Sequence, residues 1–196
     1  MGLRRKDWKE RAKAIRLLLL DVDGILTDGR ITYDGSGREW KSFDIRDGQG
    51  IRLLQRAGLE VGILSGRKSA AVRTRAKELG LRLLRQKVTD KAKALEEIMV
   101  RKNYKREHIC FVGDDLVDLP VFARVGLAVA AADSIEEVKA SAHYITRNPG
   151  GRGAVREVCD LILKAQGKWA AVTQEYTGQQ DLYERKKYFT VRLPLP

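Results

Sequence analysis

The fold of this chain is decided by Leu17-Leu18-Leu19-Leu20-Asp21-Val22-Asp23-Gly24-Ile25-Leu26-Thr27. Four consecutive leucines predict a strand that is buried on both faces, as in a parallel sheet. Two carboxylates, one residue apart, follow at the end of this strand, where open α/β sheets bind their ligands. Gly24 permits the sharp turn that such a site needs. We therefore expect the chemistry of the protein to lie at the carboxyl end of this strand.

Strand-like and helix-like patterns alternate along the chain, which predicts an α/β fold with a mostly parallel sheet flanked by helices. A length of 196 residues favours a single domain. Apolar runs predict strands, over residues 16–20, 60–64, 108–112, 125–129 and 142–145. Helical periodicity predicts helices, near residues 47–57, 68–79, 90–102, 115–123, 134–140 and 152–166.

Residues 29–43 interrupt this alternation. They read as two short strands around Asp34-Gly35-Ser36-Gly37, which is a strong signal for a β-hairpin. Because the hairpin follows directly after the aspartate motif, it should project over or beside the site. An isolated hairpin is only marginally stable, so this one needs a partner surface, either on the domain itself or on another subunit.

Composition limits the class of protein. Cys110 and Cys159 are too few for a disulfide framework, and we expect both to be free, buried thiols in a reducing cytoplasm. The sequence shows no signal peptide, because its first apolar run is short and leads into Asp21. No apolar run reaches the length of a membrane span, so we expect no membrane association.

The net charge of +12 raises the question of a nucleic-acid partner. Residues 1–16 carry seven Lys or Arg against two acidic residues, and the remaining charges alternate in sign along predicted helices. Aromatic residues do not interleave with the basic ones as a base-stacking platform requires. An anionic small substrate explains the charge equally well, and we expect no nucleic-acid partner.

Three further motifs follow the aspartate motif in order. They are Ser65-Gly66-Arg67 after a strand, Lys91 at the start of a helix, and Gly113-Asp114-Asp115-Leu116-Val117-Asp118 after another strand. In a parallel sheet the carboxyl ends of these strands lie on one edge. The four motifs should therefore form a single site.

Each of these residue types has a task in phosphoryl transfer. Asp21 can attack phosphorus, and Asp23 can protonate the leaving alcohol and later deprotonate water. Ser65 can donate a hydrogen bond to phosphate at a helix N-terminus, and Lys91 can stabilise the phosphoryl oxygens. Hard oxygen ligands from Asp21, the Asp23 backbone carbonyl and Asp114 suit Mg²⁺. We therefore predict a magnesium-dependent phosphatase.

The motifs resemble those of the haloacid dehalogenase superfamily, whose core is a Rossmann-like α/β domain. Over residues 13–168 the chain is similar to one family in particular, the phosphatases of 3-deoxy-D-manno-octulosonate 8-phosphate (KDO 8-phosphate) in lipopolysaccharide synthesis. The resemblance is carried by residues 21–51, 65–67, 113–122 and 150–163. It implies that Asp21 is the nucleophile, Asp23 the acid/base, Asp21 and Asp114 metal ligands, and Ser65 and Lys91 phosphate-site residues.

The resemblance also implies an enzyme with no separate cap domain. The hairpin would build a homotetramer, and neighbouring subunits and the C-terminal segment would close each active site. Asp115 and Asp118 would then orient the metal ligands or their waters.

Substrate selection is assigned to residues beside the motifs. Arg67, next to Gly66, offers a bidentate partner for the carboxylate of the sugar acid, and Arg46 can assist. The run Gly150-Gly151-Arg152-Gly153 would lie near a substrate pocket, with Arg152 and backbone N–H groups facing an anion. Related phosphatases of nine-carbon sialic-acid-type 9-phosphates carry Glu where this chain has Arg67, so the nine-carbon substrate is the alternative.

We divide the chain into a basic arm (1–15), a phosphatase domain (16–168) and a tail (169–196) that we expect to be extended or partly disordered. Two other function classes remain open at this point, a non-catalytic module and a nucleic-acid phosphatase on the same fold. The intact Asp21, Asp23, Lys91 and Asp114 argue against a module that has lost catalysis.

Overall fold

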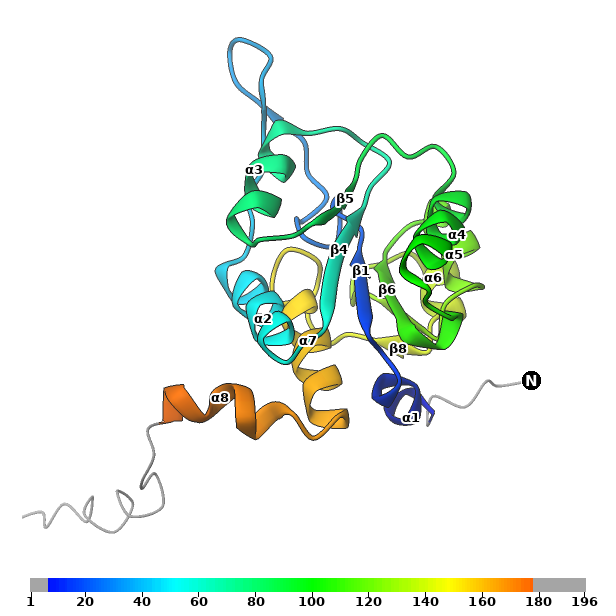
Figure 1. Cartoon of the computed structure of the whole chain (residues 1–196). Coiled ribbons are helices and arrows are strands. Elements are labelled where there is room, and N and C mark those ends of the chain that lie inside the picture. Colours follow the sequence, from blue (N-terminus) through cyan, green and yellow to red (C-terminus); the bar gives the residue numbers. More distant parts are fainter. Residues whose placement is uncertain (1–6, 178–196) are drawn as a thin grey trace, which may run out of the picture.

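The computed structural model describes residues 7–177, and all structural statements concern this range. Its main sheet is parallel, with strand order β5-β4-β1-β6-β7-β8 (Figure 1). The strands of this sheet are β1 (Leu17–Leu20), β4 (Glu60–Leu64), β5 (Leu83–Arg85), β6 (Ile109–Gly113), β7 (Leu127–Ala130) and β8 (Tyr144–Ile145). The α/β architecture expected from the alternating patterns is confirmed.

Helices cover both faces of this sheet (Figure 1). The α-helices are α1 (Trp8–Lys13), α2 (Ile45–Arg56), α3 (Ala70–Glu78), α4 (Lys91–Lys102), α5 (Leu119–Phe122), α6 (Glu136–Ser141), α7 (Ala154–Ala165) and α8 (Trp169–Thr177). Short 3₁₀ turns cover η1 (Arg106–His108) and η2 (Leu116–Asp118).

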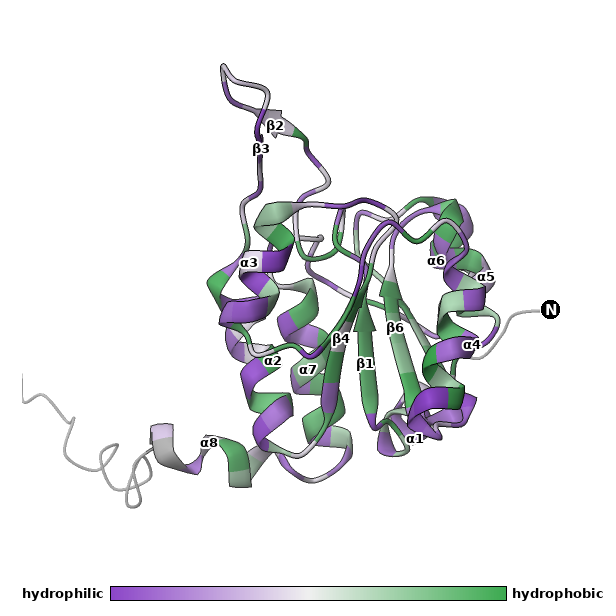
Figure 2. Ribbon diagram, turned by 45° about the horizontal axis from the view of Figure 1, so that its top comes forward, coloured by the Kyte–Doolittle hydropathy of each residue, from purple (hydrophilic) through white to green (hydrophobic). Residues whose placement is uncertain are grey.

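The four leucines of β1 explain why the sheet is covered twice. Leu18 and Leu20 pack with residues of α2, α3 and α7, whereas Leu17 and Leu19 pack with residues of α4, α5 and α6. Alternate residues of a strand face opposite sides of a sheet, and all four leucines are fully buried. Figure 2 shows the hydrophobic strands between the two helical layers. The all-apolar run is therefore the sequence signature of a central strand.

The predicted hairpin forms at the expected place. Strands β2 (Thr32–Tyr33) and β3 (Glu39–Trp40) are antiparallel, with Thr32 opposite Trp40. The Asp34 side chain holds the turn by accepting hydrogen bonds from the backbone N–H groups of Ser36 and Arg38, each at 2.9 Å. The hairpin projects beyond the carboxyl end of the main sheet (Figures 1 and 2).

Strand β5 and helix α1 were missed by the sequence patterns. Strand β5 is a three-residue, half-buried edge strand, too short to give a periodic signal. Helix α1 lies within the charged arm and is stabilised by the burial of Ala12. Several helix starts were also placed early: α3, α6 and α7 begin two residues later than expected, at Ala70, Glu136 and Ala154, and the segment after Asp115 first forms the 3₁₀ turn η2 before α5.

The expectation of an extended tail is wrong for residues 169–177, which form α8. The Tyr176 hydroxyl accepts hydrogen bonds from Gln49 Nε2 at 3.0 Å and Arg56 Nη1 at 2.6 Å, which fasten α8 to α2. Residues 1–6 of the arm and 178–196 of the tail lie outside the described residues. Within the described part of the chain, no helix is long and apolar enough to cross a membrane, and both Cys110 and Cys159 are free and buried as expected.

Candidate active site

The site lies at the carboxyl ends of β1, β4 and β6. Because Leu20 is in register with both Ile63 of β4 and Val112 of β6, the residues that follow these strands meet at one edge of the sheet. They surround a cavity of about 350 Å³. Its walls are Asp21, Asp23, Gly29, Ser65, Gly66, Arg67, Val88, Thr89, Lys91, Asp114, Asp115 and Val117. The four sequence motifs thus come together at one site.

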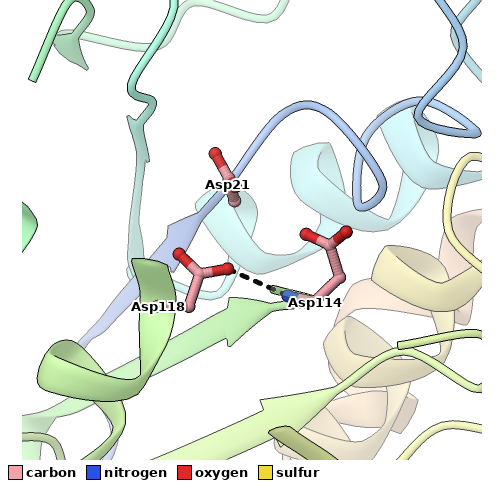
Figure 3. Close-up of side chains that lie close together, drawn as sticks. All are labelled: Asp21, Asp114 and Asp118. Carbon is pink, nitrogen blue, oxygen red and sulfur yellow. Dashed lines mark hydrogen bonds between the residues drawn. The ribbon is translucent and has the colours of Figure 1, made fainter. Parts of the chain in front are cut away.

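Three carboxylates lie close together at this edge of the sheet, two of them on the cavity wall and the third, Asp118, buried behind it (Figure 3). Asp21, Asp114 and Asp118 each present one oxygen within 4.8 Å of the others. Burial raises the pKa of Asp21 to about 6, although Lys91 opposes this rise. Burial and the charges of Asp21 and Asp118 raise the pKa of Asp114 to about 8. Ionisation of all three carboxylates would therefore leave an unfavourable excess of negative charge in the cluster.

A divalent cation would relieve this excess, and the available donors fit Mg²⁺. They are hard carboxylate oxygens, and the site is open on one side, so a small ion could keep some of its water ligands. The donor chemistry and the charge of the cluster thus match the predicted metal site at Asp21 and Asp114. Asp118, the third member of the cluster, was predicted to orient the metal ligands or their waters rather than to bind the metal itself.

Lys91 supplies positive charge from within the protein. It is the first residue of α4, and the Asp90 side chain caps that helix by accepting from Lys93 N at 2.9 Å. Its Nζ lies 2.8 Å from Asp21 Oδ2 and 2.7 Å from Asp118 Oδ1. Burial lowers the pKa of Lys91, but the two carboxylates outweigh it and raise this pKa above the ordinary value. Lys91 is therefore held in its charged form against Asp21.

Asp118 organises the third motif. Its buried carboxylate pairs with Lys91 through one oxygen and accepts the backbone N–H of Asp114 through the other at 2.9 Å (Figure 3). A Cβ on Gly113 would lie 2.5 Å from this second oxygen, so only glycine leaves room for the contact. Asp118 consequently orients both Lys91 and the turn that carries Asp114.

Two glycines let the loop after β1 approach its neighbours. Gly24 has φ +85°, and a Cβ there would lie 2.0 Å from Asp114 Oδ2. A Cβ on Gly150 would lie 1.7 Å from the Gly24 carbonyl oxygen, and Gly151 N donates to Ile25 O at 2.8 Å. The Gly150-Gly151 pair therefore packs directly against the loop that follows Asp23.

The hairpin contributes two charged residues that sequence reasoning missed. Lys41, just after β3, donates a hydrogen bond to Asp23 Oδ1 and lies 3.5 Å from Glu39 Oε1. Glu39 in turn accepts from Arg67, whose Nε lies 3.8 Å from Asp23 Oδ2. In the sequence, Glu39 and Lys41 look like the ordinary charged residues of an exposed strand. The one signal that could have identified them is that their hairpin directly follows the aspartate motif.

Ser65 lies at the end of β4 rather than at a helix N-terminus, which corrects the predicted setting. The Ser65 carbonyl accepts a hydrogen bond from Val88 N at 3.1 Å, so residues 65–67 pack on the loop before α4. Helix α3 begins only at Ala70. The Ser65 hydroxyl accepts a hydrogen bond from Arg67 N at 3.4 Å, and Ser65 lines the cavity. Ser65 can therefore donate a hydrogen bond to a phosphate in the cavity, although it does not lie at a helix N-terminus.

Comparison with known proteins identifies the family. A model of haloacid dehalogenase-like hydrolases matches residues 83–157. The chain is 47% identical over 164 residues, which are 84% of this chain and 88% of the relative, to the 3-deoxy-D-manno-octulosonate 8-phosphate phosphatase KdsC of Yersinia pestis. This chain belongs to the KDO 8-phosphate phosphatase family of haloacid dehalogenase-like hydrolases.

Solved structures of the KDO 8-phosphate phosphatase family share the fold. The Yersinia pestis structure superposes with a TM-score of 0.82, covering 83% of this chain and 88% of that chain. A Moraxella catarrhalis KDO 8-phosphate phosphatase, 40% identical, superposes with a TM-score of 0.86 over 88% of this chain and 99% of that chain. That structure was determined in complex with magnesium, phosphate and KDO.

Not all residues predicted from the KDO 8-phosphate phosphatase pattern reach the cavity. Asp21, Asp23, Ser65, Lys91 and Asp114 line it, together with Gly66, Arg67 and Asp115. Arg46 and Arg152 lie elsewhere in this chain, because Arg46 pairs with Asp44 at 2.7 Å and donates to the Arg152 carbonyl at 3.2 Å. Their assignment to substrate stays a prediction.

Proposed function

We propose that this protein is a Mg²⁺-dependent phosphatase that hydrolyses KDO 8-phosphate to KDO and inorganic phosphate. The observation that carries the proposal is the placement of Asp21 against Lys91, with Asp23 on the wall of the same cavity. One carboxylate is thereby available for attack on phosphorus while a second can handle protons. The reaction would belong to lipopolysaccharide synthesis, and the similarity to the KDO 8-phosphate phosphatase of Yersinia pestis supports the substrate. We further propose that the protein acts in the cytoplasm.

In the first step an Asp21 oxygen attacks phosphorus, and the bond from phosphorus to the sugar oxygen breaks. Asp23 donates a proton to the departing alkoxide. Lys91, buried beside Asp21, stabilises the charge on the phosphoryl oxygens, and Ser65 can donate a hydrogen bond to one of them. The product of this step is a phosphoryl group on Asp21 and free KDO.

In the second step Asp23, now ionised, takes a proton from water, which attacks the phosphoryl group on Asp21. The acyl–phosphate bond breaks, and Asp21 is regenerated with release of inorganic phosphate. Asp21, Asp114 and the Asp23 backbone carbonyl would hold Mg²⁺, and Asp115 and Asp118 would orient these groups. When bound, Mg²⁺ supplies positive charge that offsets the repulsion between phosphate and the carboxylates.

We assign substrate recognition to two residues that line the cavity. Arg67 and Gly66 line it, and the Arg67 guanidinium can pair with the carboxylate of the sugar acid. In the same proposal, Arg46 and Arg152 act on substrate from outside the cavity of their own chain, across a subunit boundary.

The proposal includes a homotetramer in which neighbouring subunits close each active site. Its support is the apolar surface of the hairpin, where Ile31, Tyr33 and Trp40 are about half exposed or more, at 48%, 60% and 63%. A two-stranded ribbon with such side chains in water is marginally stable, and apolar surface of this kind marks an interaction site.

The experiment that tests the function is phosphate release from KDO 8-phosphate with Mg²⁺ and after EDTA treatment, with a nine-carbon sugar acid 9-phosphate in parallel. We expect rapid release from the eight-carbon substrate and loss of activity with EDTA. Preference for the nine-carbon substrate would transfer the proposal to that class. No release from either, by folded and metal-loaded protein, would refute it.

A further inference from the structure

We propose that Lys41 is a positioning residue for Asp23, and that the hairpin thereby aligns the acid/base of the reaction from within the same chain. The inference rests on the proposed role of Asp23. Lys41 donates a hydrogen bond to Asp23 Oδ1, and its side chain is 1% exposed. A lysine is rarely buried to this extent unless it is paired, so the contact is a built feature of the site.

The two carboxylates of the aspartate motif are held by two different lysines. Lys91 of α4 lies 2.8 Å from Asp21, whereas Lys41 pairs with Asp23. The lysines come from different elements, because Lys91 is the first residue of α4 and Lys41 directly follows β3. Each carboxylate is thus oriented independently of the other.

Lys41 is itself anchored by an alternating series of charges. Glu39 lies 3.5 Å from Lys41 Nζ and pairs with Arg67 on the other side. The backbone of Arg67 is fixed in turn, because its N–H donates to Ser65 Oγ at 3.4 Å and its carbonyl accepts from Lys87 N at 3.2 Å. Asp23, Lys41, Glu39 and Arg67 together carry no net charge, which makes their partial burial tolerable.

The two carboxylate oxygens of Asp23 have different contacts. Oδ1 accepts from Lys41, while Oδ2 lies 3.8 Å from Arg67 Nε, beyond a hydrogen bond. The first oxygen is therefore held, and the second is available to the leaving oxygen and to water. An acid/base must place its oxygen within hydrogen-bond reach of the group it serves, and a carboxylate held at one oxygen is restricted in rotation.

The test compares Lys41→Met and Lys41→Gln with Lys41→Arg, with Arg38→Met as matched control. Arg38 is also a hairpin cation, but its side chain is 78% exposed and pairs with Asp34 at the turn. For an alkyl phosphate we expect kcat to fall by about 10–100-fold in the neutral variants, a fraction of the 10²–10⁴-fold that acid–base catalysis supplies. KM should change much less, Lys41→Arg should recover part of the rate, and Arg38→Met should match the wild type.

Leaving-group dependence separates positioning from a structural role. The p-nitrophenolate group departs without a proton, so the first-turnover burst from p-nitrophenyl phosphate should be nearly unchanged in Lys41→Met, whereas single-turnover cleavage of the alkyl phosphate slows. A crystal structure of Lys41→Met should show the Asp23 carboxylate rotated from its wild-type position. Equal loss for both substrates, a rise in KM alone, or an unmoved Asp23 would overturn the inference.

Lys41→Gln is uncharged and shorter than lysine but polar, so it provides the same comparison should Lys41→Met fold poorly. Failure of the proposed function is recognised separately. In that case the wild-type protein would leave KDO 8-phosphate intact. The Lys41 inference is decided instead by the ratio of the cleavage rates of an alkyl and an aryl phosphate. Any simple alkyl phosphate that the wild type cleaves can be used for this ratio.

Discussion

Lys91 Nζ lies 2.8 Å from Asp21 Oδ2, and the two side chains form a buried ion pair that joins α4 to the end of β1. The same Nζ lies 2.7 Å from Asp118, so one ammonium group serves two carboxylates. This arrangement fixes the orientation of the proposed nucleophile before any substrate arrives.

Replacement of Lys91 by Met should remove both the orientation of Asp21 and the positive charge at the phosphoryl oxygens. We expect kcat to fall by about 10²–10³-fold, the effect of losing one donor to transition-state charge. The free energy of unfolding should fall as well, because two buried carboxylates lose their partner. Steady-state kinetics and urea unfolding measure the two effects. Lys93→Met, an exposed position on the same helix, should change neither.

The Asp21→Asn variant should fold and show no turnover, because the amide has almost the same shape as the carboxylate but cannot attack phosphorus. Acid-quenched wild-type protein should carry a hydroxylamine-sensitive phosphoryl group that this variant lacks. The matched control is Asp28→Asn, which should stay active. Asp28 lies just past the aspartate motif and pairs with Arg30. Sustained turnover by Asp21→Asn, with deamidation excluded by mass spectrometry, would contradict the assignment.

Gly150→Ala should damage the site from a distance in sequence. The added Cβ would lie 1.7 Å from the Gly24 carbonyl oxygen, so the loop that carries Asp23 must shift. A displacement of about 1 Å can cost about 10²-fold in rate, and we expect a kcat/KM loss of that order with a lower melting temperature. Gly35→Ala, where the new methyl group meets open space, should behave as wild type. Equal activity of the two variants would refute the steric argument.

Stability should depend on pH through Asp47. Its Oδ1 accepts from Arg156 N at 2.7 Å at the start of α7, and burial raises its pKa from 3.8 to about 6. The folded state therefore holds a proton that the unfolded state has lost between pH 4 and 6. The contribution of Asp47 to stability is present below pH 4 and is lost as the pH rises through 6.

At 1.36 kcal/mol per pKa unit the loss amounts to about 3 kcal/mol. Urea unfolding from pH 4 to pH 7 should thus show a steeper decline of the unfolding free energy in the wild type than in Asp47→Asn. Parallel curves for the two proteins would exclude Asp47 as the source.

Substitution of Tyr33 and Trp40 by Ser should weaken the proposed assembly, because both side chains are exposed on the hairpin and would be buried against another subunit. Sedimentation velocity should show a smaller species than the wild type, with lower activity at equal protein concentration. Val100→Ser removes an exposed apolar residue of α4, away from the hairpin, and should leave the mass unchanged. A wild type that sediments as a monomer would disprove the tetramer.

Much of the site could be predicted from sequence because each motif is attached to the end of a strand. Asp21, Ser65 and Asp114 directly follow apolar runs, and parallel strands bring such positions to one edge. Arg46 was harder to place, because the direction of a side chain on the first turn of a helix depends on the packing of that helix. For residues 169–177 the expectation of an extended tail, drawn from polar composition, was wrong, since Tyr176 gains its partners only when α2 lies alongside.

By itself, the sequence determined the α/β class, the central strand, the hairpin and the carboxylates that we propose as catalytic, because apolar periodicity and turn residues act over short distances along the chain. Only the tertiary structure decided that Lys41 pairs with Asp23, that Asp118 shares Lys91 with Asp21, and that Gly150 packs on Gly24. These contacts join segments far apart in sequence, and which side chains meet depends on how the layers pack rather than on any local pattern.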